Sequence, residues 1–118
     1  GNMVKRSVEA YVVHHADSEA RLQMHLAAVI ASNFPNHLFS IAEELLHEKG
    51  LSFDMLKPLI RETLSKAMMM PPRDAQTGPA MRGNTAVVEK HLEMLQPHPD
   101  IREIYRLISE RILATRSK

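Results

Sequence analysis

The hydrophobic pattern of the chain contains one extended stretch, near the N-terminus. In SVEAYVVHH, residues 7–15, small and β-branched residues alternate with larger or polar ones, and this period of two predicts a short β-strand. No second strand candidate follows. A single strand has no hydrogen-bonding partner in its own domain, so we expect residues 1–15 to be an extended tail.

From residue 16 onward the apolar residues recur at helical spacing. The first helix begins at Asp17 or Ser18, both good N-cap residues, and ends at Gly50. Pro35 lies inside it and removes one backbone donor, so we expect a kink near residues 31–35. The segments that follow are a helix from Ser52 to Met70 that Pro58 kinks or delays, a loop over residues 71–84, and two helices, from about Thr85 to Leu95 and from Pro99 onward.

These elements predict an all-α fold: a helical bundle built around one long kinked helix, with a short N-terminal extended segment. We divide the chain into a tail over residues 1–15 and a helical domain over residues 16–118. The length of 118 residues, with 44% hydrophobic residues, fits one domain with a core of its own.

Charge and composition exclude several classes of function. Fifteen basic and fourteen acidic residues give a net charge of +1 without blocks of either sign, which argues against a nucleic-acid partner. Cysteine is absent and no segment is long and apolar enough to span a membrane, so we expect a cytoplasmic protein. The seven histidines form no HxxxH or HExxH pair, and we expect no metal site.

The long helix carries a line of side chains that changes from apolar to polar. At about 100° per residue its members fall within roughly 60° of one direction, and they are Leu22, Leu26, Val29, Asn33, Asn36, His37, Ser40 and Glu44. Buried amide or imidazole groups cost about 1–3 kcal/mol each when unpaired. Either the kink frees a carbonyl that Asn33 or Asn36 satisfies, or these polar groups line a ligand pocket, and both interpretations stay open.

Three other stretches allow interpretation. HLAAVIA, residues 25–31, is apolar nearly all round and must be covered on both sides, which indicates a central core helix, a partner subunit, or both.

The loop AQTGPAMRGN offers hydrogen-bond donors from Gln76, Thr77 and Arg82 beside the flexible Gly78. It lacks a preceding strand, however, and is no phosphate-binding fingerprint. The arginines of the last segment are interrupted by glutamates and predict a solvated face; they are Arg102, Arg106, Arg111 and Arg116.

The chain resembles a known protein family in three stretches: DSEARLQMHLAAVIASNFPNHLFSIAEELL, TLSKAMMMPPRDAQTGPAMRGN, and KHLEML through IYRLISERI. They closely resemble the helical C-terminal domain, of unassigned function, that follows a Rossmann-like domain in bacterial NADP-dependent oxidoreductases. The resemblance covers nearly the whole chain from about residue 16, and NFPNH with QTGPAMRG makes it specific. That domain is similar to the helical dimerisation domain of 6-phosphogluconate dehydrogenase and pyrroline carboxylate reductase.

The resemblance implies a Rossmann-like domain upstream, of which residues 1–15 are the tail or linker. NADP would bind mainly to that domain, and none is expected on this chain alone, since its four glycines form no GxGxxG. The chain would supply a homodimer contact through the long helix and a wall of the substrate pocket. The candidate residues are His37 as acid or base, with Asn33, Asn36, Gln76, Thr77, Gly78 and Arg82 for substrate.

One departure from related β-hydroxyacid dehydrogenases limits this assignment. They carry a lysine four residues before an asparagine, whereas here Val29 precedes Asn33 and Ser32 precedes Asn36. Imine-type reduction, another substrate class and a non-catalytic ligand sensor therefore stay open. The competing hypotheses are a non-catalytic helical dimerisation or interaction module and, third, a small helical nucleic-acid binder.

Overall fold

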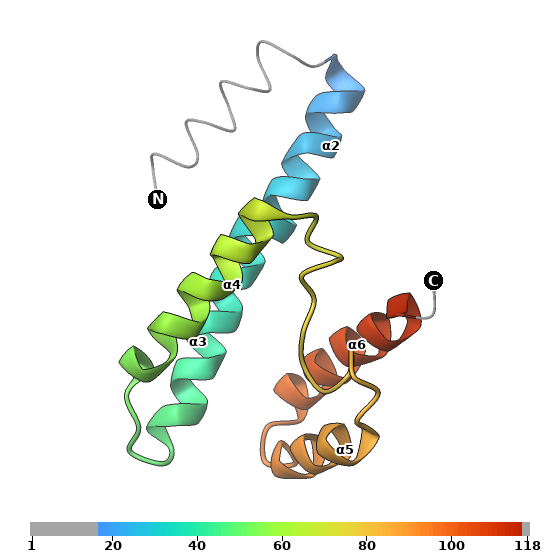
Figure 1. Ribbon diagram of the computed structural model, residues 1–118. Coiled ribbons are helices and arrows are strands. Elements are labelled where there is room, and N and C mark those ends of the chain that lie inside the picture. The colour runs from blue at the N-terminus through green and yellow to red at the C-terminus, as the bar shows by residue number, and fades with distance from the viewer. Residues whose placement is uncertain (1–16, 117–118) are drawn as a thin grey trace. The chain divides into compact units, whose positions relative to one another are not determined.

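The structure is a computed structural model that describes residues 17–116. The extended tail predicted over residues 1–15 lies outside the described residues. Within them every regular element is a helix, as the sequence predicts (Figure 1). The chain divides into two compact units, Gly1–Phe53 and Asp54–Lys118.

The described part of the first unit is the long helical segment predicted from the sequence. It consists of α2 (Ser18–Ala28), a π-helical turn (Val29–Asn33) and α3 (Phe34–His47). Asp17 caps α2 as expected, because its Oδ1 accepts a hydrogen bond of 2.8 Å from the backbone N–H of Ala20.

The irregularity expected near Pro35 is this π-helical turn. The N–H of Phe34 bonds to the carbonyl of Val29, five residues earlier, and Pro35 stands in the first turn of α3. A proline is tolerated there because the first N–H groups of an α-helix have no intrahelical partner. A π turn holds one more residue than an α turn, so α3 is rotated by about 100° relative to a continuous α-helix.

The first unit ends in a tight reversal after α3. The N–H of Gly50 bonds to the carbonyl of His47 at 3.0 Å, and Gly50 has a φ of 69°, a left-handed conformation that favours glycine. The rings of Phe39 and Phe53 then meet with centroids 6.5 Å apart. This aromatic contact attaches the end of the reversal to α3.

The second unit contains α4 (Lys57–Met69), α5 (Thr85–Met94) and α6 (Pro99–Arg116). A 3₁₀ helix (Phe53–Leu56) precedes α4, and Pro58 stands in the first turn of α4. Pro58 therefore delays the regular helix, which is one of the two outcomes that the sequence allows.

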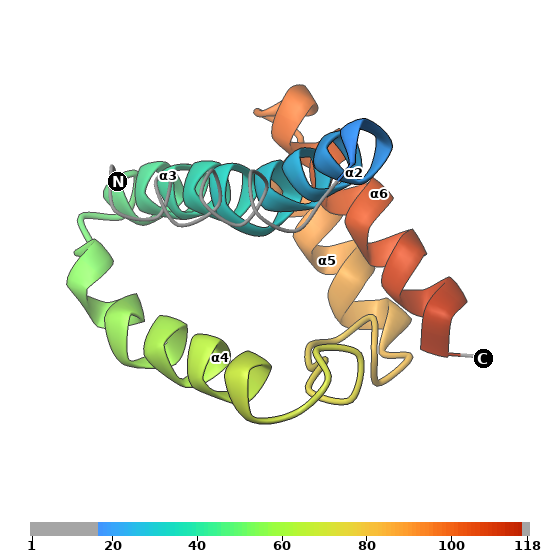
Figure 2. The ribbon, with the colours of Figure 1, turned by 90° about the horizontal axis from the view of Figure 1, so that it is seen from above.

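Helices α5 and α6 pack against each other, as Figure 2 shows. His91 Nδ1 and the Tyr105 hydroxyl lie 2.7 Å apart, with the two rings edge to face. Arg102 Nε donates a hydrogen bond of 3.1 Å to the carbonyl of Leu92. Two polar contacts thus fix this helix pair in addition to its apolar contact.

The loop between α4 and α5 folds back on itself just before α5. The N–H of Asn84 bonds to the carbonyl of Pro79 at 2.8 Å, and its side chain accepts a bond from Val87 at the start of α5. Ala80, inside this turn, is only 7% exposed. The end of the QTGPAMRGN stretch is therefore a compact, internally bonded turn.

Few side chains are buried within either unit. Among the described residues only Ala80 and Leu95 count as buried hydrophobic side chains. Large hydrophobic residues stay exposed on α2, α3 and α4, with Leu22 at 73% and Met68 at 84%. Taken by itself, each unit therefore leaves these helix faces uncovered. None of the described helices is long and apolar enough to cross a membrane.

Candidate functional site

The predicted site residues fall into two groups, three in the first unit and four in the second. Asn33 ends the π-helical turn, and Asn36 and His37 lie in the first turns of α3. All three side chains are exposed. Within residues 17–116 none of them makes a side-chain hydrogen bond, so neither asparagine satisfies a carbonyl freed by the irregular turn. Their donors and acceptors are available to solvent or to a ligand.

The π-helical turn also changes which residues share a face. The regular spacing used for the sequence places Asn36 about 40° from Leu22, but the extra residue of the wide turn rotates α3 by about 100° and moves Asn36 to about 140° from Leu22. His37 moves from about 60° on one side of Leu22 to about 40° on the other. Asn36 therefore leaves the line of Leu22, whereas His37 stays beside it. Asn33 and His37, four residues apart, lie on one face, and Asn36 is about 100° away from His37.

A different apolar line results from the same rotation. Five apolar residues are spaced four positions apart. In a continuous α-helix this spacing turns each side chain by about 40° around the helix axis relative to the one before it, or by about 160° over the five residues. The wide turn subtracts about 100° of this drift, which leaves all five within roughly 60°. We call this set the apolar line; its residues are Leu22, Leu26, Ile30, Phe34 and Leu38, with exposed fractions of 73%, 55%, 55%, 57% and 39%.

The second group of predicted residues belongs to the loop before α5. Gln76 Nε2 donates a hydrogen bond of 3.1 Å to the carbonyl of Thr77, and both residues border a cavity of about 390 Å³ against the end of α4. Gly78 has a φ of 102°, which allows the sharp turn of the loop. Arg82 is exposed and does not border this cavity. Gln76 and Thr77 are therefore the two predicted loop residues that share a cavity.

A larger cavity of about 630 Å³ lies on the other side of the loop. We call it the arginine cavity, because Arg73, Arg111 and Arg116 line it together with Asp74 and Gln76. Arg73 Nη2 donates a hydrogen bond of 3.2 Å to the carbonyl of Thr115, which connects the loop to the end of α6. The cavity is therefore closed partly by the loop and partly by the last turns of α6.

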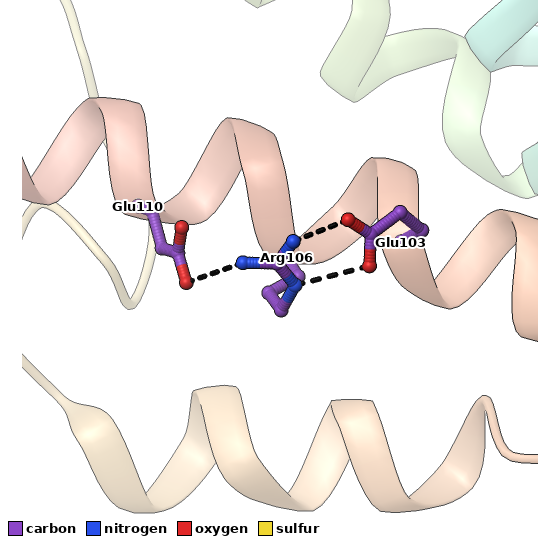
Figure 3. A network of polar contacts seen from close by, with 3 residues as sticks. All are labelled: Glu103, Arg106 and Glu110. Carbon is purple, nitrogen blue, oxygen red and sulfur yellow. Dashed lines mark hydrogen bonds and ion pairs between the residues drawn. The ribbon is translucent and has the colours of Figure 1, made fainter.

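Arg106, also on α6, is in contrast neutralised by carboxylates. It donates two hydrogen bonds to Glu103 and one of 2.8 Å to Glu110 (Figure 3). The hydrogen bonds from Arg106 hold the pKa of Glu103 below its ordinary value and raise the pKa of Arg106. Arg106 is thus part of an exposed ion-pair network along one helix.

Sequence reasoning therefore missed the arginine cavity. It assigned Arg111 and Arg116 to a solvated face together with Arg102 and Arg106, whereas the structure separates them. Arg102 bonds to a backbone carbonyl, Arg106 is paired with carboxylates, and Arg111 and Arg116 border a cavity. The signal in the sequence is weak: Arg111 has no acidic residue three or four positions away on either side, whereas Arg106 has Glu103 and Glu110 at this spacing. No three histidine, aspartate or glutamate side chains of the described chain are grouped to hold a metal ion.

Comparisons with known proteins place these observations in a family. The family model described as "Domain of unknown function (DUF2520)" matches residues 4–112. A crystal structure from Bacteroides fragilis, described as a "putative NADP oxidoreductase", superimposes with a TM-score of 0.81 at 45% sequence identity. The match covers 84% of this chain and 38% of that one, so the chain spans well under half the length of this neighbour. None of the curated proteins compared with the chain matches it.

Proposed function

This chain belongs to the DUF2520 family, and on that premise we propose that it is the substrate-pocket and dimerisation domain of an NADP-dependent oxidoreductase, not catalytic by itself. The name of the Bacteroides fragilis neighbour supports an oxidoreductase, and its greater length is consistent with a further domain in the parent protein. In this proposal a Rossmann-like domain of the parent binds most of the NADP. The helical domain closes over the nicotinamide end, where ligand sites of such folds lie.

The observation that carries the proposal is the apolar line. It spans residues 22–38, or about 24 Å of helix, and every member is at least 39% exposed. Isolated exposed leucines are normal on protein surfaces, but five aligned along one helix mark an interaction surface. We infer that a second copy of the chain covers it, with the two long helices crossing about a twofold axis, because most homo-oligomers are symmetric dimers.

The exposed area is sufficient for such a dimer. Burying the exposed fractions of the five side chains contributes about 4–8 kcal/mol per copy, and therefore about 8–16 kcal/mol for two copies. Association costs about 4–15 kcal/mol in lost translational, rotational and side-chain freedom. The two ranges overlap, so we expect a dimer of moderate affinity, stabilised further by the other domain of the parent.

Asn33 and His37 are the proposed contribution of the long helix to the substrate pocket. They lie on a face next to the apolar line, exposed and without hydrogen bonds within the described residues, on a helix that is fixed by the neighbouring subunit. His37 would act as general acid or base, the role that histidine most often takes in enzymes. Gln76 and Thr77 border a separate cavity within the second unit, where they would offer polar groups to a ligand.

The test of this role is His37→Asn in the intact parent protein. Loss of a general acid or base typically lowers kcat by about 10²–10⁴, and we expect KM to change little. Glu44→Gln is the matched control, because Glu44 is exposed on the same helix. A nicotinamide bound far from Asn33 and His37, or equal kcat for both variants, would exclude a catalytic role. Reading the coding sequence upstream of Gly1 for a strand followed by GxGxxG tests the cofactor assignment separately.

The second candidate is a non-catalytic dimerisation module, which the apolar line alone supports. Here Asn33 and His37 would serve only the subunit contact. Asn33→Ala distinguishes the two candidates. If this change weakens the dimer of the intact parent protein and leaves ligand binding unchanged, the result supports the dimerisation module. If it weakens substrate binding and leaves the dimer unchanged, the result supports the oxidoreductase pocket.

A further inference from the structure

The arginine cavity is independent of the residues assigned to dimerisation and of His37. Its basic groups come from two parts of the chain, Arg73 from the loop after α4 and Arg111 and Arg116 from the last turns of α6. Its volume of about 630 Å³ falls in the range of roughly 300–1,000 Å³ found for small-molecule sites. Asp74 is the acidic residue of its lining.

Most of the positive charge of this cavity has no carboxylate partner among residues 17–116. Arg106 on the same helix has two carboxylate partners (Figure 3). Within residues 17–116, by contrast, Arg111 and Arg116 make no ion pair or hydrogen bond, and Arg73 bonds only to a backbone carbonyl. Three guanidinium groups and one carboxylate give the lining a net charge of +2. Like charges held around one volume repel each other unless an anion lies between them.

One of the three guanidinium groups is held in place by a hydrogen bond, and a second lies close to the backbone. Arg73 is fixed by its bond of 3.2 Å to the carbonyl of Thr115. Arg116 lies against the backbone of Gly83 so closely that an added Cβ there would come within 2.7 Å of its Nη1. Because each guanidinium has five donors in a planar fork, Arg73 retains donors after this contact. The cavity therefore presents positioned donors before any ligand arrives.

We propose that the arginine cavity binds a phosphate group of a small molecule. A phosphate monoester carries about −1.5 to −2 charges at pH 7, which matches the net charge of the lining, and its oxygens accept the paired donors of arginine. A carboxylate carries half this charge and leaves one guanidinium unmatched. The phosphate belongs to a substrate or to the cofactor, and the experiment below separates these sources.

One feature opposes anion binding and limits the affinity. The carboxyl end of α6 carries the negative end of the helix dipole. Arg73 reduces this effect, because it donates to the carbonyl of Thr115, one of the last free carbonyls of the helix. We therefore expect dissociation constants between about 0.1 and 1 mM rather than tight binding.

The test is titration of this 118-residue chain with inorganic phosphate, followed by calorimetry or NMR. Arg111→Gln should weaken phosphate binding about tenfold, since it removes charge-assisted hydrogen bonds to the ligand. Arg61→Gln is the matched control: it removes the same charge from an exposed position on α4 that borders no described cavity, and it should change the affinity by less than about twofold.

Further titrations identify the source of the phosphate. Binding of NADP but not NAD, lost with Arg111→Gln, assigns the site to the 2′-phosphate of the cofactor; binding of phosphate with neither dinucleotide assigns it to a substrate. Acetate that binds as tightly as phosphate would overturn the assignment. So would equal losses in the Arg111 and Arg61 variants, or no saturable phosphate binding below roughly 10 mM. Failure of the dimer or of His37 catalysis leaves these outcomes unchanged.

Discussion

Phe34→Ala is the most direct perturbation of the proposed dimer. Phe34 is the first residue of α3 and the middle of the apolar line, and it is 57% exposed. Alanine is the best helix former, and the backbone bond from residue 34 to Val29 does not need the ring. The change therefore removes apolar surface from the line and retains the helix that carries it.

The magnitude follows from the exposed area. An aromatic side chain of about 200 Å² that is 57% exposed offers about 110 Å² to a partner, worth about 3 kcal/mol at about 25 cal/mol per Å². In a symmetric dimer the loss occurs twice, about 6 kcal/mol as an upper bound. We expect the dissociation constant to increase by about three to four orders of magnitude.

The assay is sedimentation equilibrium of the chain over a series of concentrations. Met94→Ala is the control, because Met94 is 63% exposed but lies on α5, away from the apolar line. We expect the Met94→Ala variant to sediment as the unsubstituted 118-residue chain does, and the Phe34→Ala variant to sediment as a monomer. The reasoning would be refuted if the unsubstituted chain is monomeric at about 100 μM, or if the two substitutions change the dissociation constant equally.

Three further predictions concern the π-helical turn, the loop and the ion-pair network. Pro35→Ala restores the missing N–H, so we expect a continuous α-helix in which the apolar line is split and self-association is weaker. Sedimentation identical to that of the unsubstituted chain would count against the proposed rotation of α3. Gly83→Ala places a Cβ 2.7 Å from Arg116 Nη1 at a φ of 70°, and it should lower the free energy of unfolding by about 1–3 kcal/mol in urea titrations. The folded-state pKa of Glu103 is lowered by Arg106, so its contribution to stability is present above the unfolded-state pKa and is lost as pH falls through the folded-state pKa. Glu103→Gln should therefore flatten the decline in stability below about pH 4.5, and acid unfolding curves that coincide would contradict this.

The helices were predictable because their ends carry local signals. Asp17 and Asn84 accept the capping hydrogen bonds that their positions predict, and Gly50 adopts the left-handed conformation typical of a helix end. The form of the irregular turn was not predictable. Pro35 shows that a donor is missing, but a kink and a π turn both accommodate that loss. The proline by itself does not choose between them.

The candidate site was only partly predictable for the same reason. Extrapolating a regular helix across the π-helical turn placed Asn36 in line with Leu22, an error of one inserted residue that moves every later side chain by about 100°. The arginine cavity depends on the contact between Arg73 and Thr115, 42 positions apart in sequence. No periodicity within one helix indicates such a contact.

The two buried side chains, Ala80 and Leu95, have a consequence for how stability is measured. Native domains are stabilised by a small surplus of burial over conformational entropy, and in the proposed dimer part of that burial forms only when chains meet. Folding and association are then one equilibrium, governed by mass action. The melting temperature becomes a function of protein concentration, so a value obtained at one dilution describes that dilution and does not characterise the sequence.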